Sequence, residues 1–293
     1  MNLSNPPLRA ERWRLRRRDL PLGRMPLLMG ILNVTPDSFS DGGRFQHPSV
    51  AIDHGLRLVA EGADLLDIGG ESTRPNSVAV DTDEELRRVM PVVSALCRQV
   101  DVPVSIDTSK ALVAREALAA GAEIINDVTG LTGDPQMIDV AVESGAGVCV
   151  MHMRGNPQTM QDDPSYEDVV AEVMDYLRGR RDALVAAGIS QDRIAVDPGI
   201  GFGKKTAHNL QLLSGSWRFH QLGCPVLVGH SRKGFIGKLI GNRGADRTAG
   251  TIGAALALVL QGVQILRVHD VAALRHAIAL FEAAGGLLPS ADP

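Results

Sequence analysis

Residues 102–127 read VPVSIDTSKALVAREALAAGAEIIND and contain a complete strand–helix–strand unit. An aliphatic run at 102–106 ends in the polar string Asp107-Thr-Ser-Lys110, and an Ala-rich amphipathic segment follows at 110–120. A second aliphatic run at 123–126 ends in Asn126-Asp127. Short apolar runs are typical of strands buried on both faces, and a helix between two of them indicates parallel pairing. The segment therefore predicts one step of a parallel α/β sheet.

The same unit recurs along the rest of the chain. Strands are expected at 27–33, 64–68, 102–106, 123–126, 147–151, 193–196, 225–228 and 263–268. Amphipathic segments that predict helices lie at 49–61, 82–99, 110–120, 134–144, 166–187 and 248–261. Eight β/α units favour a closed (β/α)8 TIM barrel, a fold of roughly 250 residues, over an open doubly wound sheet. We expect an N-terminal extension at 1–26, with a β-hairpin, a barrel domain at 27–287, and a tail at 288–293.

Length, charge and composition exclude several classes of protein. The 293 residues carry 30 Lys and Arg against 34 Asp and Glu, a net charge of −4, so we expect no nucleic-acid partner. Hydrophobic residues make up 44% and charged residues 22%, the mixture of a folded globular chain. No apolar leader precedes residue 26 and no apolar run approaches the ~20 residues of a membrane span, so we expect no membrane partner.

The cysteines and one basic segment each allow more than one interpretation. Three cysteines lie singly, which predicts buried thiols in a reduced, cytoplasmic protein rather than a disulfide framework or a zinc site. The basic segment at 9–18 fits a surface strand, and a nucleic-acid arm or a transit segment is the alternative.

Polar clusters follow the predicted strands, and in a parallel barrel the strand ends meet at one mouth. One group of side chains is cationic and suits an anionic or phosphorylated substrate: Arg74, Arg232, Lys233, Arg267 and His269. A second group is rich in acceptors and consists of Asp107, Asn126 and Asp197. A heterocycle with a ring N–H beside an exocyclic amino group would offer two parallel donors to one carboxylate. For Asp107, capping of the following helix is the other interpretation.

The sequence does not match the motifs of three other kinds of site: a phosphate-binding loop, a glycosidase pair of carboxylates and a histidine metal site. The glycines at 199–203 lack the spacing of a phosphate-binding loop. The excess of cations at the mouth is foreign to a two-carboxylate glycosidase. His152, His230 and His269 follow three different strands, and we expect them to form hydrogen bonds rather than a metal site.

Seven strings taken together resemble one known family. They are GILNVTPDSFSDGG (30–43), DIGGESTRP (67–75), SIDTSK (105–110), INDVTG (125–130), DPGIGFGK (197–204), SRKGFIG (231–237) and RVHDV (267–271). Their order and sequence resemble the dihydropteroate synthases of the pterin-binding family. The resemblance implies condensation of 6-hydroxymethyl-7,8-dihydropterin diphosphate with 4-aminobenzoate, giving 7,8-dihydropteroate and diphosphate in folate biosynthesis.

The resemblance also implies roles for particular residues. Those that would contact the pterin diphosphate are Thr73, Asp107, Asn126, Asp197, Lys233, Arg267 and His269. Those that would hold 4-aminobenzoate are Pro75, Phe202, Ser231 and Lys233. The catalytic group would be Asn33, Asp41, Arg74, Asp107, Lys233, Arg267 and His269, and Asn33 would also bind Mg²⁺ with the diphosphate oxygens.

The resemblance further implies dissociative substitution, in which diphosphate departs before the amine attacks, and a homodimer formed through late barrel helices. The Ala-rich segment at 249–261 could pack against another helix or against the barrel. Two other functions are considered: a pterin-binding methyltransferase domain that serves a corrinoid partner, and a non-catalytic pterin-binding protein. The cations at 231–233 and 267–269 favour the synthase over the methyltransferase, and the loop residues Asn33, Asp41, Thr73 and Arg74 favour an enzyme.

Overall fold

Within the described part of the chain, eight strands form one parallel sheet that curls into a ring. The computed structural model describes residues 9–35, 48–73, 77, 79–156, 159–160, 162–242 and 244–287. The strands are β3 (Leu27–Asn33), β4 (Leu65–Gly69), β5 (Val104–Asp107), β6 (Ile124–Asp127), β7 (Gly147–Met151), β8 (Ile194–Asp197), β9 (Leu227–Val228) and β10 (Ile265–Val268). They pair in the order β8-β7-β6-β5-β4-β3-β10-β9, and a bridge between Val196 and Val226 joins β8 to the segment before β9. The barrel prediction is confirmed, and the open sheet is wrong.

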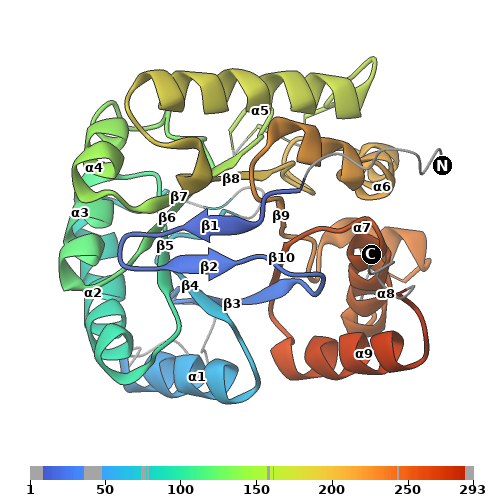
Figure 1. Ribbon diagram of the computed structural model, residues 1–293, viewed down its shortest axis with the longest axis horizontal. Helices are drawn as coiled ribbons and strands as arrows, with labels where there is room; N and C mark the ends of the chain where they lie inside the picture. Colours follow the sequence, from blue (N-terminus) through green and yellow to red (C-terminus); the bar gives the residue numbers. More distant parts are fainter. Residues whose placement is uncertain are drawn as a thin grey trace.

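Helices surround this ring (Figure 1). They are α1 (Pro48–Ala60), α2 (Thr82–Gln99), α3 (Ala111–Ala120), α4 (Met137–Ser144), α5 (Val169–Ala186), α6 (Thr206–Ser214), α7 (Gly234–Leu239), α8 (Thr248–Leu260) and α9 (Val271–Ala283), with 3-10 helices η2 (Gln191–Arg193) and η3 (Ser216–Leu222). Asp134 lies before α4 and accepts a hydrogen bond from the backbone N–H of Ala111 at 2.9 Å. Its carboxylate therefore serves the start of α3, while its other oxygen accepts from the backbone N–H of Gln136 directly before α4 at 2.9 Å, and α4 begins three residues later than predicted.

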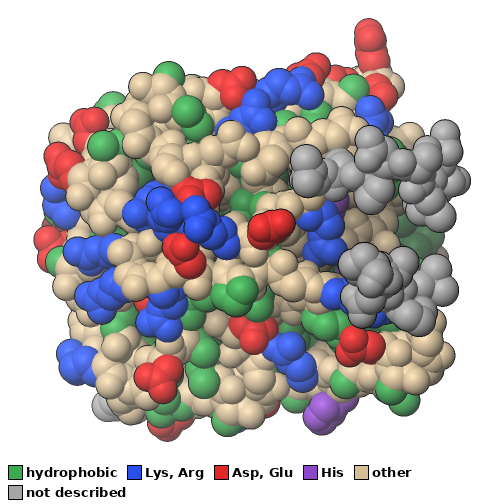
Figure 2. All heavy atoms as spheres, in the orientation of Figure 1, with side chains coloured by type: hydrophobic (Ala, Val, Ile, Leu, Met, Phe, Trp, Pro, Cys, Tyr) green, Lys and Arg blue, Asp and Glu red, His purple; other side chains and the backbone are tan. Residues whose placement is uncertain are grey.

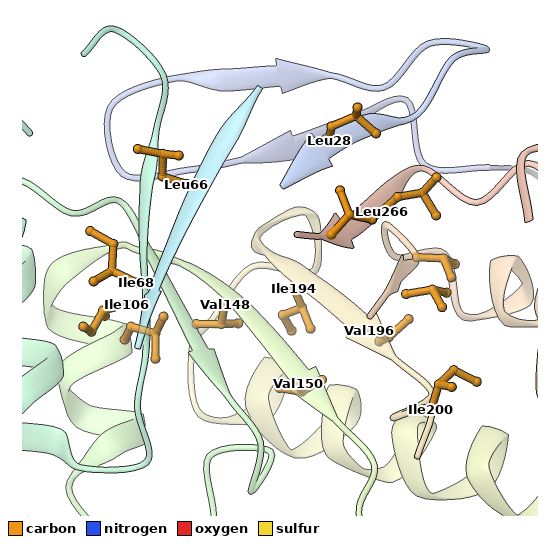
Figure 3. Packing of buried hydrophobic residues seen from close by; sticks show 14 of the residues in the cluster. Leu28, Leu66, Ile68, Ile106, Val148, Val150, Ile194, Val196, Ile200 and Leu266 are labelled. Carbon is orange, nitrogen blue, oxygen red and sulfur yellow. The ribbon is translucent and has the colours of Figure 1, made fainter. Parts of the chain in front are cut away.

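The side chains on the two faces of each strand pack in different places. Alternate side chains point outward and form the large aliphatic core between barrel and helices, part of which is drawn in Figure 3. Leu66 and Ile68 of β4 belong to this outer layer. Their neighbours of opposite parity point into the barrel, because successive side chains of a strand face opposite sides.

A hairpin closes the amino-terminal end of the barrel. Strands β1 (Arg12–Arg14) and β2 (Asp19–Pro21) pair antiparallel, and Figure 1 shows them lying across the strand ends. Trp13 and Leu15 are buried and pack on a floor layer made of Met29, Leu65, Ile124, Cys149, Ala195, Leu227 and Ile265. The Trp13 indole N–H donates to the carbonyl of Arg193 at 2.9 Å. The predicted N-terminal hairpin thus seals the interior from below.

The basic segment at 9–18 has a structural use. Arg16 donates to the carbonyl of Leu118 in the last turn of α3, and Arg18 donates to that of Asp101 just beyond α2. Two arginines outside this segment make similar hydrogen bonds. Arg193 donates to the carbonyl of Gly145 at the end of α4, and Arg275 donates to that of Gly62 just after α1. A cation at a helix carboxyl end satisfies open carbonyls and the negative end of the dipole. Figure 2 shows this basic surface over the hairpin, with acidic side chains among it.

Removal of these contacts is expected to lower stability modestly. Arg16→Ala should reduce the free energy of unfolding by up to about 1 kcal/mol, because an exposed cation at a helix end contributes only a few tenths to one. Urea denaturation of this variant at low salt measures the loss. Arg24→Ala, at an exposed position that caps no helix end in the described structure, is the control; equal losses in the two proteins would contradict the capping role.

Other expectations concern cysteines, membranes and domain limits. The three cysteines are free; Cys149 and Cys224 are buried, Cys97 is half-buried, and burial raises the pKa of all three thiols. Among the described residues, no helix is both long and apolar enough to cross a bilayer. The division at 26/27 and 287/288 stays a prediction, and the tail at 288–293 lies outside the described residues.

Candidate active site

The alternation of the strands carries polar side chains into the upper half of the barrel. Four floor residues are followed, two positions later, by a residue on the same inward face. These pairs are Leu65 and Asp67, Ile124 and Asn126, Ala195 and Asp197, and Ile265 and Arg267. The register adds Asp107, which lies opposite Gly69 of β4 and Asn126 of β6. One polar layer therefore stands directly above an apolar one.

Arg267 is the centre of this polar layer. Its Nε donates to Oδ2 of Asp67 at 2.6 Å, and its Nη2 donates to Oδ2 of Asp107 at 2.7 Å. Asn126 donates from Nδ2 to the same Asp67 oxygen at 3.0 Å. Asp67 is fully buried, and 19% of the Arg267 side chain is exposed. Two carboxylates from neighbouring strands thus hold one guanidinium, which compensates for removing their charges from water.

The electrostatics of the cluster follow from burial and charge. Burial raises the pKa of the Asp107 carboxyl above its usual range; Arg267 opposes that rise, and the neighbouring Asp67 adds to it. The Arg267 guanidinium remains charged, since the two carboxylates raise its pKa against the effect of burial. The capping interpretation of Asp107 is not what the structure shows, because its carboxylate contacts Arg267 and α3 has no side-chain cap from it.

Asp197 and Lys233 form the second part of the site. Oδ1 of Asp197 accepts the backbone N–H of Gly199 at 2.7 Å. Burial raises the pKa of Asp197 to about 6, with Gly199 and Lys233 opposing the rise. Burial also lowers the pKa of Lys233 to about 8, and nearby Arg267 lowers it further. The Lys233 ammonium lies 4.0 Å from the centroid of the Phe202 ring, a cation–π contact.

The loop that carries Phe202 is anchored by a buried lysine. Nζ of Lys204 donates to the carbonyls of Phe202 at 2.9 Å and His152 at 3.2 Å, and lies 2.9 Å from Nδ1 of His152. Burial and Lys204 together lower the pKa of His152 to about 3, so its ring is neutral. Burial also lowers the pKa of Lys204 to about 7. Gly201, with φ of 85°, passes beside Lys233, where an added Cβ would lie 3.1 Å from Cδ of the lysine.

Two further predicted residues meet at the rim of the barrel. Oγ of Ser231 accepts the backbone N–H of His269 at 3.2 Å and lies 3.0 Å from its Nδ1. Arg232, predicted as part of the cationic group, turns to the exterior and pairs with Asp270 through Nε at 2.9 Å and through Nη2. Half of its side chain is exposed. The mouth therefore has one fewer available cation than the sequence suggests.

Of the remaining predicted site residues, some are described by the structure and others lie outside the described residues. Asn33 lies at the end of β3 and Thr73 shortly after β4, both partly exposed. Asp41, Arg74 and Pro75 lie outside the described residues. The described parts of the chain contain no group of three or more His, Cys, Asp or Glu side chains suited to a metal ion. His230 donates from Nε2 to the carbonyl of Thr251 at 3.0 Å.

Asp67 is the residue that analysis of strand ends missed. It lies inside β4 rather than after it, and it contacts both Arg267 and Asn126. A signal was available, since a carboxylate within a buried aliphatic run is costly unless it has a partner.

The comparisons with known proteins agree with this geometry. A family model described as pterin binding enzyme matches residues 29–269. The dihydropteroate synthase of Escherichia coli K12 is 45% identical over 258 residues, which cover 88% of this chain and 91% of that protein. The structure of Yersinia pestis dihydropteroate synthase in a sulfonamide drug complex has a TM-score of 0.88 at 43% identity, covering 94% of this chain and all of that one. The structure of Xanthomonas albilineans dihydropteroate synthase with 4-aminobenzoic acid has a TM-score of 0.87 at 48% identity, covering 95% and 99%.

Sequence, fold and polar layer lead to the same result. The matched region begins at the third residue of β3 and ends at the residue after β10, so it includes nearly the whole ring of strands. Identity above two fifths over nearly the full length of these proteins is far more than a shared barrel requires. The chain belongs to the dihydropteroate synthases, transferases of folate biosynthesis in the pterin-binding family.

Proposed function

We propose that this chain joins 6-hydroxymethyl-7,8-dihydropterin diphosphate to 4-aminobenzoate. A C–N bond forms between the exocyclic methylene and the amine, the C–O bond to diphosphate breaks, and the amine loses a proton. The observation that carries the proposal is the polar layer inside the barrel. It places the acceptors Asp107, Asn126 and Asp197 around Arg267, with Lys233 beside them.

The pterin would lie in the polar layer. Oδ1 of Asp197 is used by Gly199, so Oδ2 is the oxygen left for the donors of an amino-substituted ring. A Cβ added at Gly229 would lie 3.7 Å from both that oxygen and Cδ of Arg267, so the glycine leaves open the space between them. A flat ring placed there would stack on the guanidinium of Arg267, a planar and weakly hydrated cation.

The aminobenzoate site would be the rim formed by Phe202, Ser231 and Lys233, with Pro75 from outside the described residues. Phe202 is buried with the Lys233 ammonium over its ring, and the same ammonium is close enough to Asp197 to lower the pKa of that carboxyl, so the lysine lies between the aromatic wall and the pterin side. We expect Lys233 to serve both substrates for this reason.

The leaving diphosphate would be held by Arg267, His269 and Thr73, with Arg74 from outside the described residues; Asp41, also outside them, would belong to the segment that covers the aminobenzoate site. Cations that bind the leaving oxygens more strongly as charge grows lower the barrier to departure. Asp107, close to the methylene-bearing ring, would stabilise the cation that remains. In this dissociative reaction no side chain acts as a nucleophile.

Asn33 fits a role in Mg²⁺ binding. Asn33 is the last residue of β3, and a hard cation prefers oxygen ligands such as an amide oxygen, with the others taken from phosphates and water. When bound, the ion would neutralise charge on the diphosphate.

The decisive experiment measures diphosphate release with and without 4-aminobenzoate. Release that depends on aminobenzoate, together with 7,8-dihydropteroate, is the expected result. Pterin binding without turnover would indicate a non-catalytic binder. Methyl transfer from methyltetrahydrofolate to a corrinoid would indicate the methyltransferase alternative, and either result would reject the proposal.

Asp197→Asn is expected to weaken pterin binding by about 1.5–3 kcal/mol, because a charge-assisted pair is replaced by an amide that offers a donor to a donor. Isothermal calorimetry with the pterin diphosphate, without aminobenzoate, measures the change. Unaltered affinity would contradict the assignment of Asp197.

Pterin affinity should depend on pH in a bell-shaped manner. Asp197, with a pKa of about 6, loses its charge as the pH falls below that value, and Lys233, with a pKa of about 8, loses its charge as the pH rises above that value. Affinity should therefore be greatest between about pH 6 and 8 and decline on either side. Calorimetry from pH 5 to 9 tests this, and Lys233→Met should remove the alkaline limb. A flat profile would contradict the assigned roles.

Assembly and location complete the proposal. We expect a homodimer, although the buried residues of α8, which include Ala255 and Leu258, pack on the barrel. Leu260 and Leu280 are exposed apolar positions at the ends of α8 and α9 that support an interface on this side. A cytoplasmic location stays a prediction.

A further inference from the structure

Asp67 connects two residues that would read the substrate. It is fully buried within β4, and its Oδ2 accepts from Arg267 Nε at 2.6 Å and from Asn126 Nδ2 at 3.0 Å. We propose that Asp67 is a positioning residue that fixes the orientation of both side chains and thereby makes the site selective for an amino-substituted ring. The inference rests on the proposed pterin site.

The first consequence concerns the Asn126 amide. A carboxylate only accepts hydrogen bonds, so the nitrogen of the amide, and not its oxygen, must face Asp67. This leaves the Asn126 carbonyl oxygen and its second N–H for a ligand, side by side and in a fixed order. They complement an exocyclic amino group next to a ring nitrogen that accepts. An amide free to turn over would offer the two groups in either order and would discriminate less.

The second consequence concerns the Arg267 guanidinium. Asp67 holds it at Nε and Asp107 holds it at Nη2, so two points define its plane. A planar fork held at two points is an ordered surface for a stacked ring. Of its five N–H donors, three are not used by these two carboxylates and can face an anionic group. Without the hydrogen bond from Nε to Asp67, the guanidinium could rotate away from the stacked ring and from the anionic group.

A structural role alone does not account for Asp67. Its other oxygen, Oδ1, is buried and has no hydrogen-bond partner among the described residues. A buried acceptor without a donor is costly, and such groups in native proteins require an explanation. Glu123, by comparison, is buried below the site and uses both oxygens, on the backbone N–H of Arg17 and on the Arg18 guanidinium. At Asp67 one oxygen performs all the positioning, which points to placement of Arg267 and Asn126 rather than to stability.

The test is Asp67→Asn, assayed by calorimetry with 6-hydroxymethyl-7,8-dihydropterin diphosphate in the absence of aminobenzoate. The amide has no negative charge, so its oxygen accepts more weakly from the Arg267 guanidinium at Nε, and its NH2 group can face the Asn126 amide and allow it to turn over; we therefore expect the Kd to rise about ten- to a hundredfold. Stoichiometry should stay near one, and the KM for aminobenzoate should stay within about twofold. Partial unfolding would lower the stoichiometry and kcat without changing Kd, which separates positioning from stability.

Asp127→Asn is the matched control. Asp127 is also buried, stands at the end of β6, two strands from β4, and accepts from Thr129 and Leu131 of its own loop. Its substitution should leave the pterin Kd within about twofold. If Asp67→Asn also leaves the Kd within twofold, the proposal is overturned.

A second measurement examines selectivity directly. The wild-type chain should bind the pterin more tightly than the analogue that lacks the exocyclic amino group, and Asp67→Asn should lose most of that ratio. Asp67→Ser, which leaves space for a water to bind one donor, serves if the asparagine variant does not fold. An unchanged ratio in the folded variant overturns the inference. Failure of the wild-type chain to bind the pterin at all would instead reject the proposed function.

Discussion

Replacing Arg267 with methionine should give the largest loss of any single substitution in the site. Asp67 and Asp107 would become buried carboxylates without their cation, and breaking a buried pair in this way costs about 3–5 kcal/mol of stability. Turnover should fall by at least about a hundredfold, because the same guanidinium would hold the ring and the leaving diphosphate.

The pH dependence of this loss has a definite sign. Arg267 lowers the pKa of Asp107, so its removal raises that already elevated pKa further. A carboxyl whose pKa is higher in the folded than in the unfolded chain takes up a proton on folding, and stability then increases as the pH falls through the folded value. Urea denaturation at pH 8 and pH 5.5 should show a smaller difference from the wild type at the lower pH.

Arg232→Met is the control for this experiment. Arg232 also contacts an aspartate through two nitrogens, but its side chain is half exposed at the rim. Its loss should cost under about 1 kcal/mol, as for other exposed ion pairs. Similar destabilisation of the two variants would show that the buried position of Arg267 contributes nothing.

Lys233→Met should weaken the binding of both substrates. The Lys233 ammonium interacts electrostatically with Asp197 and lies over the Phe202 ring. Loss of this one charged group therefore affects both the pterin pocket and the aminobenzoate rim. Lys233 also lowers the pKa of Asp197, and its removal would leave more of that carboxyl protonated at neutral pH. We expect about a tenfold or greater loss for each substrate.

Steady-state kinetics with each substrate varied in turn would test the double effect. Asp197→Asn is the comparison, since it should raise the KM for the pterin diphosphate and leave that for aminobenzoate nearly unaltered. A Lys233→Met enzyme that loses affinity for only one substrate would contradict the shared position of the lysine.

The barrel could be predicted because its strands are buried on both faces. Apolar runs such as those at 147–151 and 193–196 have no polar alternation, and polar strings mark where each ends. The limits of helices were less predictable: Asp134 accepts from Gln136 just before α4 and also from Ala111 at the start of α3, a contact across 23 residues. Nothing in the local sequence distinguishes those two partners.

Part of the site could be predicted for the same reason. Asp107, Asn126 and Asp197 end parallel strands, and the structure brings them to one level around Arg267. The pairing of Arg232 with Asp270 could not be predicted, since the residues are 38 positions apart and meet only because β9 and β10 are neighbours. Which oxygen serves which donor at Asp67 is likewise a matter of three-dimensional geometry.

The plug formed by Trp13 and Leu15 has a consequence for the order of events. With the lower end closed, any small molecule inside the barrel must use the upper opening for both arrival and departure. A ring bound at Asp197 and Arg267 has to be seated before a second reactant occupies the approach above it. The product must then leave through the same opening by which the two reactants entered. A second reactant that bound too early would block the entry of the ring.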